Sequence, residues 1–247
     1  MKVSIITVCF NSEKTIEDTI KSVESQTYPD IEYIVIDGLS VDKTNVIISK
    51  YRKTVSIHLS EKDKGLYDAM NKGVSLATGG IIGILNSDDI LSNDSIIEDI
   101  VCSLGQHDGV YGDVCFYSGD DFSNKKRYYS SKGFNKFKFY RGMMPAHPSF
   151  YVRRKCYQRA GLYRTDLNIA ADFDMVLRIF SIAETSFIYL EREIVKMRLG
   201  GVSTSGLMSN YTLNKEILES CRNNGIKANW FSVLSKYPGK ILGYFLK

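Results

Sequence analysis

The amino-acid sequence predicts an α/β fold in which helices flank a mostly parallel central sheet. Short apolar, β-branched runs alternate with amphipathic segments through the first 117 residues. Strands and helices that alternate at this spacing form right-handed crossovers, so the strands lie parallel and helices cover both faces. Polar side chains also cluster directly after each of the first four predicted strands. Because ligands bind at the carboxyl ends of strands in such sheets, the fold class predicts where a site lies.

The first strand and helix follow from the local pattern. Val3–Phe10 is a short β-branched run typical of a buried strand. Apolar residues recur at helical spacing through Glu13–Gln26, behind an N-cap at Asn11 or Ser12. Tyr28-Pro29-Asp30 then turns the chain.

The same alternation continues to Tyr117. Four more strands are expected at Ile31–Ile36, Val55–Leu59, Ile81–Leu85 and Gly109–Tyr117. Three more helices are expected at Asp42–Lys53, Leu66–Ala77 and Asn93–Leu104.

The alternation stops after Tyr117. Ser118–Arg141 is polar, basic and aromatic, with weak periodicity. Strands at Ser149–Val152 and Ser186–Tyr189 and helices at Asp174–Ala183 and Leu213–Asn223 are expected beyond it. No linker is evident, so we expect one domain with two unequal halves, residues 1–117 and 118–206, followed by a C-terminal helical tail at 207–247.

Composition narrows the class of protein. The 247 residues are 44% hydrophobic and 24% charged, which is ordinary for a globular domain. The net charge of +4 argues against bulk nucleic-acid binding but allows anionic substrates or lipids. Five scattered cysteines without a C-x-x-C pair indicate reduced thiols in the cytosol. No apolar run reaches the roughly 20 residues that span a bilayer.

The polar clusters are the strongest functional signal. They lie at 7–11, 37–42, 61–65 and 86–89, each directly after a predicted strand. Helix capping explains any one of them, because Asp, Asn and Ser commonly begin helices. Four clusters at one sheet edge indicate a site instead.

Carboxylates at this edge indicate a metal. The loop after the first strand, "CFNSEK", lacks the glycines that cradle phosphate in dinucleotide-binding folds, and a P-loop is absent. Carboxylates hold a phosphate only through a cation, and hard oxygen ligands suit Mg²⁺ or Mn²⁺. We therefore expect Asp88 and Asp89 to share a divalent ion with a diphosphate.

Four strings occur in an order that resembles a known family. They are "VSIITVCFNSEKTIEDTIKSVESQTYPDIEYIVIDGLSVDKT", "SEKDKGLYDAMNKGVSLATGGIIGILNSDD", "HPSFYVRRKCYQRAGLY" and "AADFDMVLRI". From about Lys2 to Ser203, the chain resembles the inverting GT-A glycosyltransferases of family 2, bacterial enzymes of surface-polysaccharide assembly. The resemblance implies the GT-A fold, a Rossmann-like nucleotide-diphospho-sugar transferase fold.

The resemblance also implies a donor site. The positions that match the nucleoside contacts of the family are Thr7, Asn11 and Asp37. Asp63 matches the segment that closes over the base. Asp88 matches the acid that binds ribose and metal.

Further positions complete the implied site. Asp89 is the second implied metal ligand, and Asp172 matches the catalytic base at the start of a later helix. Asn71 and Lys72 are expected among the nucleotide-sugar-binding residues. An arginine common before Asn71 is Met70 here, so a diphosphate contact either falls to Lys72 or is missing. The resemblance thus makes residues 1–117 a nucleotide-sugar-binding half and 118–206 an acceptor and catalytic half.

The chain departs from the family pattern in three further places. Asn86 stands at the first acid of a common D-x-D-D motif, and Ala171 replaces the usual acid before Asp172. The Q-x-x-R-W signature of processive members is absent, which favours addition of a single sugar.

Asp172 and His147 each have two interpretations. As a general base, Asp172 would contribute about 10²–10⁴-fold to the rate. The alternative is N-capping of its helix, which Asp174 could also provide. His147, in "MMPAHPSF", either orients the diphosphate and completes the metal shell or is a packed, hydrogen-bonded residue.

Three segments lack a single interpretation. Lys125–Gly142 interleaves basic and aromatic residues, which suits a sugar–pyrophosphate acceptor, single-stranded nucleic acid or a solvated loop. Lys227–Lys247 suits an interfacial membrane segment, a packed helix or a homodimer contact. Gly200-Gly201-Val202-Ser203 resembles a loop that closes over the donor, or is a plain turn.

The sequence thus predicts an inverting, metal-dependent glycosyltransferase. It would move one sugar from a UDP-sugar or related donor to a glycan or polyprenyl-diphosphate-linked acceptor, using Mn²⁺ or Mg²⁺. A non-catalytic binding module and a sugar-nucleotide nucleotidyltransferase are the alternatives. Retention of Asp88, Asp89 and Asp172 counts against the first, and "CFNSEK" counts against the second. We expect a cytoplasmic protein, peripheral on the inner membrane face.

Overall fold

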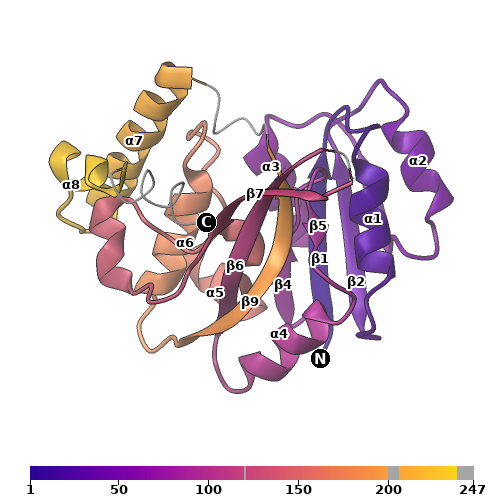
Figure 1. The fold of residues 1–247 in the computed structure, drawn as a ribbon, viewed down its shortest axis with the longest axis horizontal. Coiled ribbons are helices and arrows are strands. Elements are labelled where there is room, and N and C mark those ends of the chain that lie inside the picture. The colour runs from indigo at the N-terminus through magenta and orange to yellow at the C-terminus, as the bar shows by residue number, and fades with distance from the viewer. Residues whose placement is uncertain (120, 200–205, 238–247) are drawn as a thin grey trace.

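A computed structural model describes residues 1–119, 121–199 and 206–237, and it has a twisted sheet with helices on both faces (Figure 1). The strands are β1 (Val3–Cys9), β2 (Ile31–Asp37), β3 (Ile57–Ser60), β4 (Ile81–Ile84), β5 (Ile90–Leu91), β6 (Gly109–Ser118), β7 (Asn124–Tyr129), β8 (Tyr151–Arg153) and β9 (Phe187–Arg198). The α-helices are α1 (Ile16–Glu24), α2 (Thr44–Lys50), α3 (Leu66–Leu76), α4 (Ile96–Leu104), α5 (Arg154–Ala160), α6 (Ala171–Ser181), α7 (Gly206–Asn223) and α8 (Trp230–Leu234). Two 3₁₀ helices are η1 (Lys136–Arg141) and η2 (His147–Ser149).

The first half of the sheet confirms the predicted parallel order. The strands run β3-β2-β1-β4-β8-β6-β9-β5, with β7 paired to β6. β1 is parallel to both β2 and β4, and β2 is parallel to β3. The carboxyl ends of these four strands therefore lie at one edge, as the sequence predicted.

The second half makes the sheet mixed. The short strand β8 lies between β4 and β6 and is antiparallel to both. β9 is parallel to β6 and antiparallel to β5. β9 runs to Arg198, whereas the sequence predicted a strand that ends at Tyr189. The charged run Glu191-Arg192-Glu193 resembled a loop, but it continues the strand beside β6.

Some other boundaries also differ from the predictions. β7 falls in the segment that was predicted to be irregular. The strand was missed because its Lys- and Arg-rich sequence lacks apolar alternation. Within the described residues, β7 pairs with β6. α6 begins at Ala171, three residues before the predicted start. The tail contains a short separate helix, α8.

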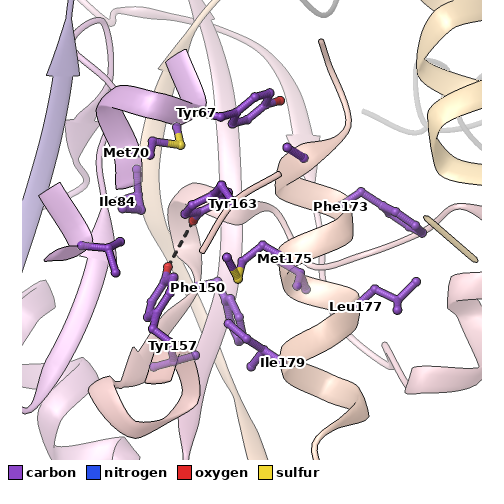
Figure 2. Packing of buried hydrophobic residues seen from close by; sticks show 14 of the residues in the cluster. Tyr67, Met70, Ile84, Phe150, Tyr157, Tyr163, Phe173, Met175, Leu177 and Ile179 are labelled. Carbon is purple, nitrogen blue, oxygen red and sulfur yellow. Dashed lines mark hydrogen bonds between the residues drawn. The ribbon is translucent and has the colours of Figure 1, made fainter. Parts of the chain in front are cut away.

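Side chains that alternate along the central strands contribute to two hydrophobic cores. In β1, Ile6 and Val8 face a core shared with α3, α5, α6 and α7. Ile5 and Val3 face the opposite core, shared with α1, α2 and α4. Figure 2 shows the first core, where residues of α3 and α6 pack around the hydrogen-bonded pair Tyr157 and Tyr163. Helices on both faces fix the strands, and therefore fix the edge where the polar loops emerge.

Two predicted segments lie partly or wholly beyond what the structure describes. The loop at 200–203 and the tail residues 238–247 are outside the described residues. In the described part of the chain, no helix has both the length and the apolar character to cross a membrane.

Candidate active site

The loops after β1, β2 and β4 lie in contact at the sheet edge. The backbone N–H of Asn11 donates to Ser40 Oγ at 2.7 Å, and Asn11 Oδ1 accepts from the backbone of Val41 at 3.0 Å. The hydroxyls of Ser12 and Ser87 lie 3.0 Å apart. Three of the four polar clusters are thereby joined, as the parallel order predicted.

Asp37, at the end of β2, is held by a ring of donors. Its carboxylate accepts from Ser60 Oγ at 2.6 Å, from Asn45 Nδ2 at 2.8 Å and from the Ser40 hydroxyl. Burial would raise the pKa of Asp37, but these hydrogen bonds outweigh burial and lower it. Asp37 is also fully buried, with both oxygens engaged within the protein, so a contact with the nucleoside stays a prediction.

Asp63, after β3, lies directly against the β2 loop. A Cβ placed on Gly38 would be 2.5 Å from Asp63 Oδ2 and 3.4 Å from the ring of Phe10. A side chain at position 38 would therefore displace the Asp63 carboxylate. Asp63 also accepts from the backbone N–H of Gly65 at 2.9 Å, which shapes the turn into α3. The fourth polar cluster therefore reaches the same edge.

Two predicted donor-binding residues have their side chains engaged within the protein. Thr7 is fully buried, and its hydroxyl accepts from Tyr33 at 3.0 Å. Asn71 binds the backbone of Tyr163, since its Oδ1 accepts from the Tyr163 N–H at 2.7 Å and its Nδ2 donates to the Tyr163 C=O at 2.9 Å. A donor contact by either side chain stays a prediction.

Lys72 holds the loop after β3. Its ammonium group lies 2.9 Å from Glu61 and donates to the carbonyl of Lys62 at 3.0 Å. Contact with a diphosphate would require Lys72 to exchange these partners, so this role also stays a prediction.

Asp88 and Asp89 differ sharply in their surroundings. Asp89 is 1% exposed and accepts from Asn86 Nδ2 at 3.0 Å and from the Arg198 backbone at 3.3 Å. Asp88 is partly exposed, and no hydrogen bond from another described residue reaches its carboxylate. Asn86, which replaces the first acid of the common motif, therefore serves to hold Asp89.

The raised pKa values of Asp88 and Asp89 favour a bound cation. Burial raises the pKa of Asp88, although the charges of Arg198 and His147 oppose the shift. Burial, followed by repulsion from Asp88, raises the pKa of Asp89 well above its usual range. A divalent ion bound here would favour both ionised forms.

The carboxylates fit such an ion, although they do not form a preformed cage. Within the described residues, no cluster of three or more His, Cys, Asp or Glu is arranged to hold a metal. Mg²⁺ and Mn²⁺ commonly bind through one or two carboxylates, with water and substrate phosphates as the other ligands. Asp88, with its uncommitted oxygens, is the better placed of the two acids.

Asp172 and His147 meet at the same site from distant elements. Asp172 lies in the first turn of α6, and His147 begins η2. Asp172 Oδ2 is 3.1 Å from His147 Nδ1. His147 also exerts its charge on Asp88, so the predicted base and the predicted metal ligands are neighbours.

The alternative roles proposed for Asp172 and Asp174 can be separated. The residue at the N-cap of α6 is Ala170, and no side chain caps the helix. Asp174 is 1% exposed and pairs with Arg178 at 2.7 Å, which makes it part of the packing. Asp172 remains partly exposed, with one carboxylate oxygen toward His147.

Glu216 was not singled out from the sequence, yet it holds the backbone of the turn that leads into Asp172. This residue of α7 is 6% exposed. Its carboxylate accepts the backbone N–H groups of residues 168, 169 and 170 at 2.8, 2.9 and 2.9 Å. Burial would raise the pKa of Glu216, but these bonds outweigh burial and lower it. Tyr67 donates to the carbonyl of Ile169 at 2.7 Å from the other side. A carboxylate on the buried face of an amphipathic helix was the available signal.

Arg198 was also missed. It ends β9, donates through its backbone to Asp89, and its guanidinium pairs with Asp18 at 2.6 Å. The strand that carries Arg198 was predicted to end nine residues earlier, so the sequence gave no signal for its place.

Comparisons with known proteins agree with this geometry. Residues 4–161 match the family described as Glycosyl transferase family 2. A PGL/p-HBAD biosynthesis glycosyltransferase of Mycobacterium tuberculosis (strain ATCC 25177 / H37Ra) is 29% identical over 223 residues, covering 87% of this chain and 82% of that protein. An uncharacterized glycosyltransferase of the same species (strain CDC 1551 / Oshkosh) is 32% identical over 184 residues, which cover 74% of this chain and 70% of that one.

Solved structures share the fold. S. aureus TarS residues 1–349 in complex with UDP-GlcNAc align with a TM-score of 0.68 at 20% identity, over 92% of this chain and 68% of that one. The alignment covers 41% of a longer TarS chain. The mannosyltransferase PcManGT of Pyrobaculum calidifontis, in complex with GDP-Man and Mn²⁺, aligns with a TM-score of 0.63 at 16% identity, over 98% of this chain and 80% of that one.

The family match spans more than half of the chain and includes the loops that carry Asp37, Asp63, Asp88 and Asp89. The chain therefore belongs to glycosyl transferase family 2.

Proposed function

We propose that this glycosyltransferase is inverting and metal-dependent, and that it transfers one sugar from a UDP-sugar. The observation that carries the proposal is the 3.1 Å contact between Asp172 and His147, near the partly exposed Asp88 and the buried Asp89. A base and a cation-binding carboxylate pair in one place are what a single displacement needs. The UDP-GlcNAc complex of the TarS fragment supports the choice of donor.

Each side chain has a distinct role in this proposal. Asp172 accepts the proton of the acceptor hydroxyl as that oxygen attacks the anomeric carbon. His147, protonated on Nδ1, donates to Asp172 and orients its carboxylate. Asp37 and Asp63 hold the nucleoside at the other end of the edge.

Asp88 and Asp89 would hold the cation, with Asp88 as the principal ligand. A bound divalent ion would neutralise the leaving diphosphate as a Lewis acid. Asn86 and the Arg198 backbone fix Asp89, so the pair presents its charge in one orientation.

The proposed acceptor is a glycan or a polyprenyl-diphosphate-linked saccharide in cell-surface polysaccharide or lipopolysaccharide assembly. A putative teichuronic acid biosynthesis glycosyltransferase of Bacillus subtilis (strain 168), 35% identical over 97 residues, supports this class. Those residues are 38% of each chain. We place the reaction in the cytoplasm, in keeping with five free cysteines.

A donor-hydrolysis screen tests the proposal. UDP-, GDP- and dTDP-sugars are incubated with the protein in Mn²⁺ or in EDTA, and the anomeric configuration of the product is read by NMR. We expect hydrolysis of a UDP-sugar with inversion, dependent on Mn²⁺ and lost in Asp88→Asn. The exposed Asp94, changed to Asn, is the matched control and should behave as wild type. Full activity in EDTA would overturn metal dependence, and a retained configuration would overturn the single displacement.

A further inference from the structure

Large apolar side chains are exposed together on η1 and α8. The exposed fractions are 86% for Phe231, 75% for Phe137, 46% for Leu234, 43% for Tyr140 and 42% for Trp230. Single exposed apolar residues are ordinary, but gathered ones mark interaction surfaces.

The two elements form one surface because they are bonded to each other. Arg141, which ends η1, donates from Nε to Ser235 Oγ at 3.0 Å and from Nη2 to the Ser235 carbonyl at 3.1 Å. Phe139 of η1 and Val233 of α8 are both buried in the same core. The remaining rings of these two elements are therefore directed away from that core.

The start of α7 extends this surface. Tyr211 is 56% exposed and stacks on Trp230, with ring centroids 5.6 Å apart and planes at 14°. Met208 of α7 is 77% exposed. We call the exposed residues of these three elements the aromatic face. α7 and α8 lie at one end of the molecule, and α2 lies at the other (Figure 1).

Two of the three elements of the aromatic face, η1 and α8, lie in acid-free sequence, whereas α7 carries Glu216 and Glu219. No Asp or Glu occurs from Phe122 to Arg164, or from Ser220 to Lys247, whereas both stretches are rich in Lys and Arg. Lys136 precedes Phe137, and Lys227 lies just before α8; both are exposed. Among the described residues, neither forms an ion pair. The face is therefore apolar and positively charged at once.

We propose that the aromatic face docks the protein onto an anionic lipid bilayer. Aromatic rings flanked by lysines suit the headgroup region, where rings enter the acyl boundary and ammonium groups meet lipid phosphates. A second copy of the chain is a poorer occupant, because two-fold pairing would bring lysines against lysines. Helix α8 thus packs on the domain through Val233 and still presents rings outward, and η1 forms the second half of the surface.

Vesicle co-sedimentation tests the docking surface. The full chain is mixed with phosphatidylcholine vesicles, with or without phosphatidylglycerol, at low and high salt. We expect binding only to the vesicles that contain phosphatidylglycerol, with release in high salt. Phe231→Ser and Phe137→Ser should each weaken binding at least about tenfold, since each removes an aromatic ring that would be buried in the bilayer. Val46→Ser changes a residue of α2 that is 60% exposed, and it should have no effect.

A second pair of variants tests the contribution of charge to vesicle binding. Lys136→Glu should weaken binding at least about fivefold, because each lysine near an anionic surface contributes about 1 kcal/mol. Lys50→Glu, at the exposed end of α2, is its control. All five variants should keep wild-type donor hydrolysis, so a failure of docking is distinguishable from a failure of the proposed reaction.

Three outcomes would overturn the docking surface. One is an absence of binding to anionic vesicles by the wild-type chain. Another is equal loss of binding in Val46→Ser and Phe231→Ser. The third is a dimer in sedimentation velocity that Phe231→Ser dissociates, which would identify the aromatic face as a contact between copies of the chain.

Discussion

Replacing Glu216 by Gln tests whether α7 positions the catalytic turn. Glu216 Oε1 accepts one backbone N–H, and Oε2 accepts two, at 2.9 Å each. A glutamine retains one carbonyl oxygen and presents an NH₂ group in place of the other. At least one backbone N–H of residues 168–170 therefore loses its acceptor, and the remaining bonds lose their charge assistance.

The expected cost follows from these bonds. A buried donor left without an acceptor costs about 1–3 kcal/mol, and hydrogen bonds to charged groups are about twice as strong as neutral ones. We expect the free energy of unfolding of Glu216→Gln to fall by about 2–3 kcal/mol. For a chain of this size that corresponds to a Tm about 4–12 °C lower. A displaced Asp172 should lower kcat by about ten- to hundredfold. KM for the donor should stay unchanged, because Glu216 binds the backbone of the turn before α6.

Glu219→Gln is the matched control, since it makes the same change one helical turn later. Glu219 is 43% exposed and pairs with Arg164, so the loss should be within about 1 kcal/mol. Thermal unfolding and steady-state transfer kinetics are the two assays. If Glu216→Gln matched Glu219→Gln in both, or raised donor KM as much as it lowered kcat, the positioning role would be refuted.

The remaining predictions concern the acids of the site. Asp172→Asn should abolish transfer and leave UDP affinity nearly unchanged. Asp166→Asn changes an exposed residue and is the control that should keep the transfer rate. More than a few per cent residual transfer in Asp172→Asn would exclude Asp172 as the base. UDP should raise the Tm with Mn²⁺ and much less with EDTA, and Asp88→Asn should remove most of the metal-dependent part; equal protection in EDTA would contradict the cation role. Because the pKa of Asp88 is raised in the folded state, its protonated carboxyl stabilises that state only at pH values below this raised pKa. The stabilisation is lost as the pH rises through the raised pKa. Asp88→Asn should therefore raise the Tm in EDTA at neutral pH, and a lower Tm would contradict this. As pH falls, Mn²⁺-dependent protection should fade above the ordinary Asp pKa of about 3.9, because the carboxylate must be ionised to bind; protection unchanged down to that pH would contradict it.

Local pattern alone determined the parallel half of the fold. β-branched runs and helical periodicity are properties of neighbouring residues, so the predicted strands and helices through Tyr117 correspond to β1–β4, β6 and α1–α4, with small shifts at their ends. The positions of Asp37, Asp63 and Asp88 followed, because a parallel sheet brings successive strand ends to one edge. This determined the place of the proposed donor site without any long-range contact.

Tertiary structure alone decided the second half and the partners within the site. β9 contains a charged run that no local rule assigns to a strand, and only pairing with β6 extends it to Arg198. Likewise, the contact between His147 and Asp172 joins residues 25 positions apart, and Glu216 reaches the turn before α6 from a helix 46 residues further along. Such contacts depend on how helices pack, and the packing energy is spread over many side chains that the local sequence does not relate to one another.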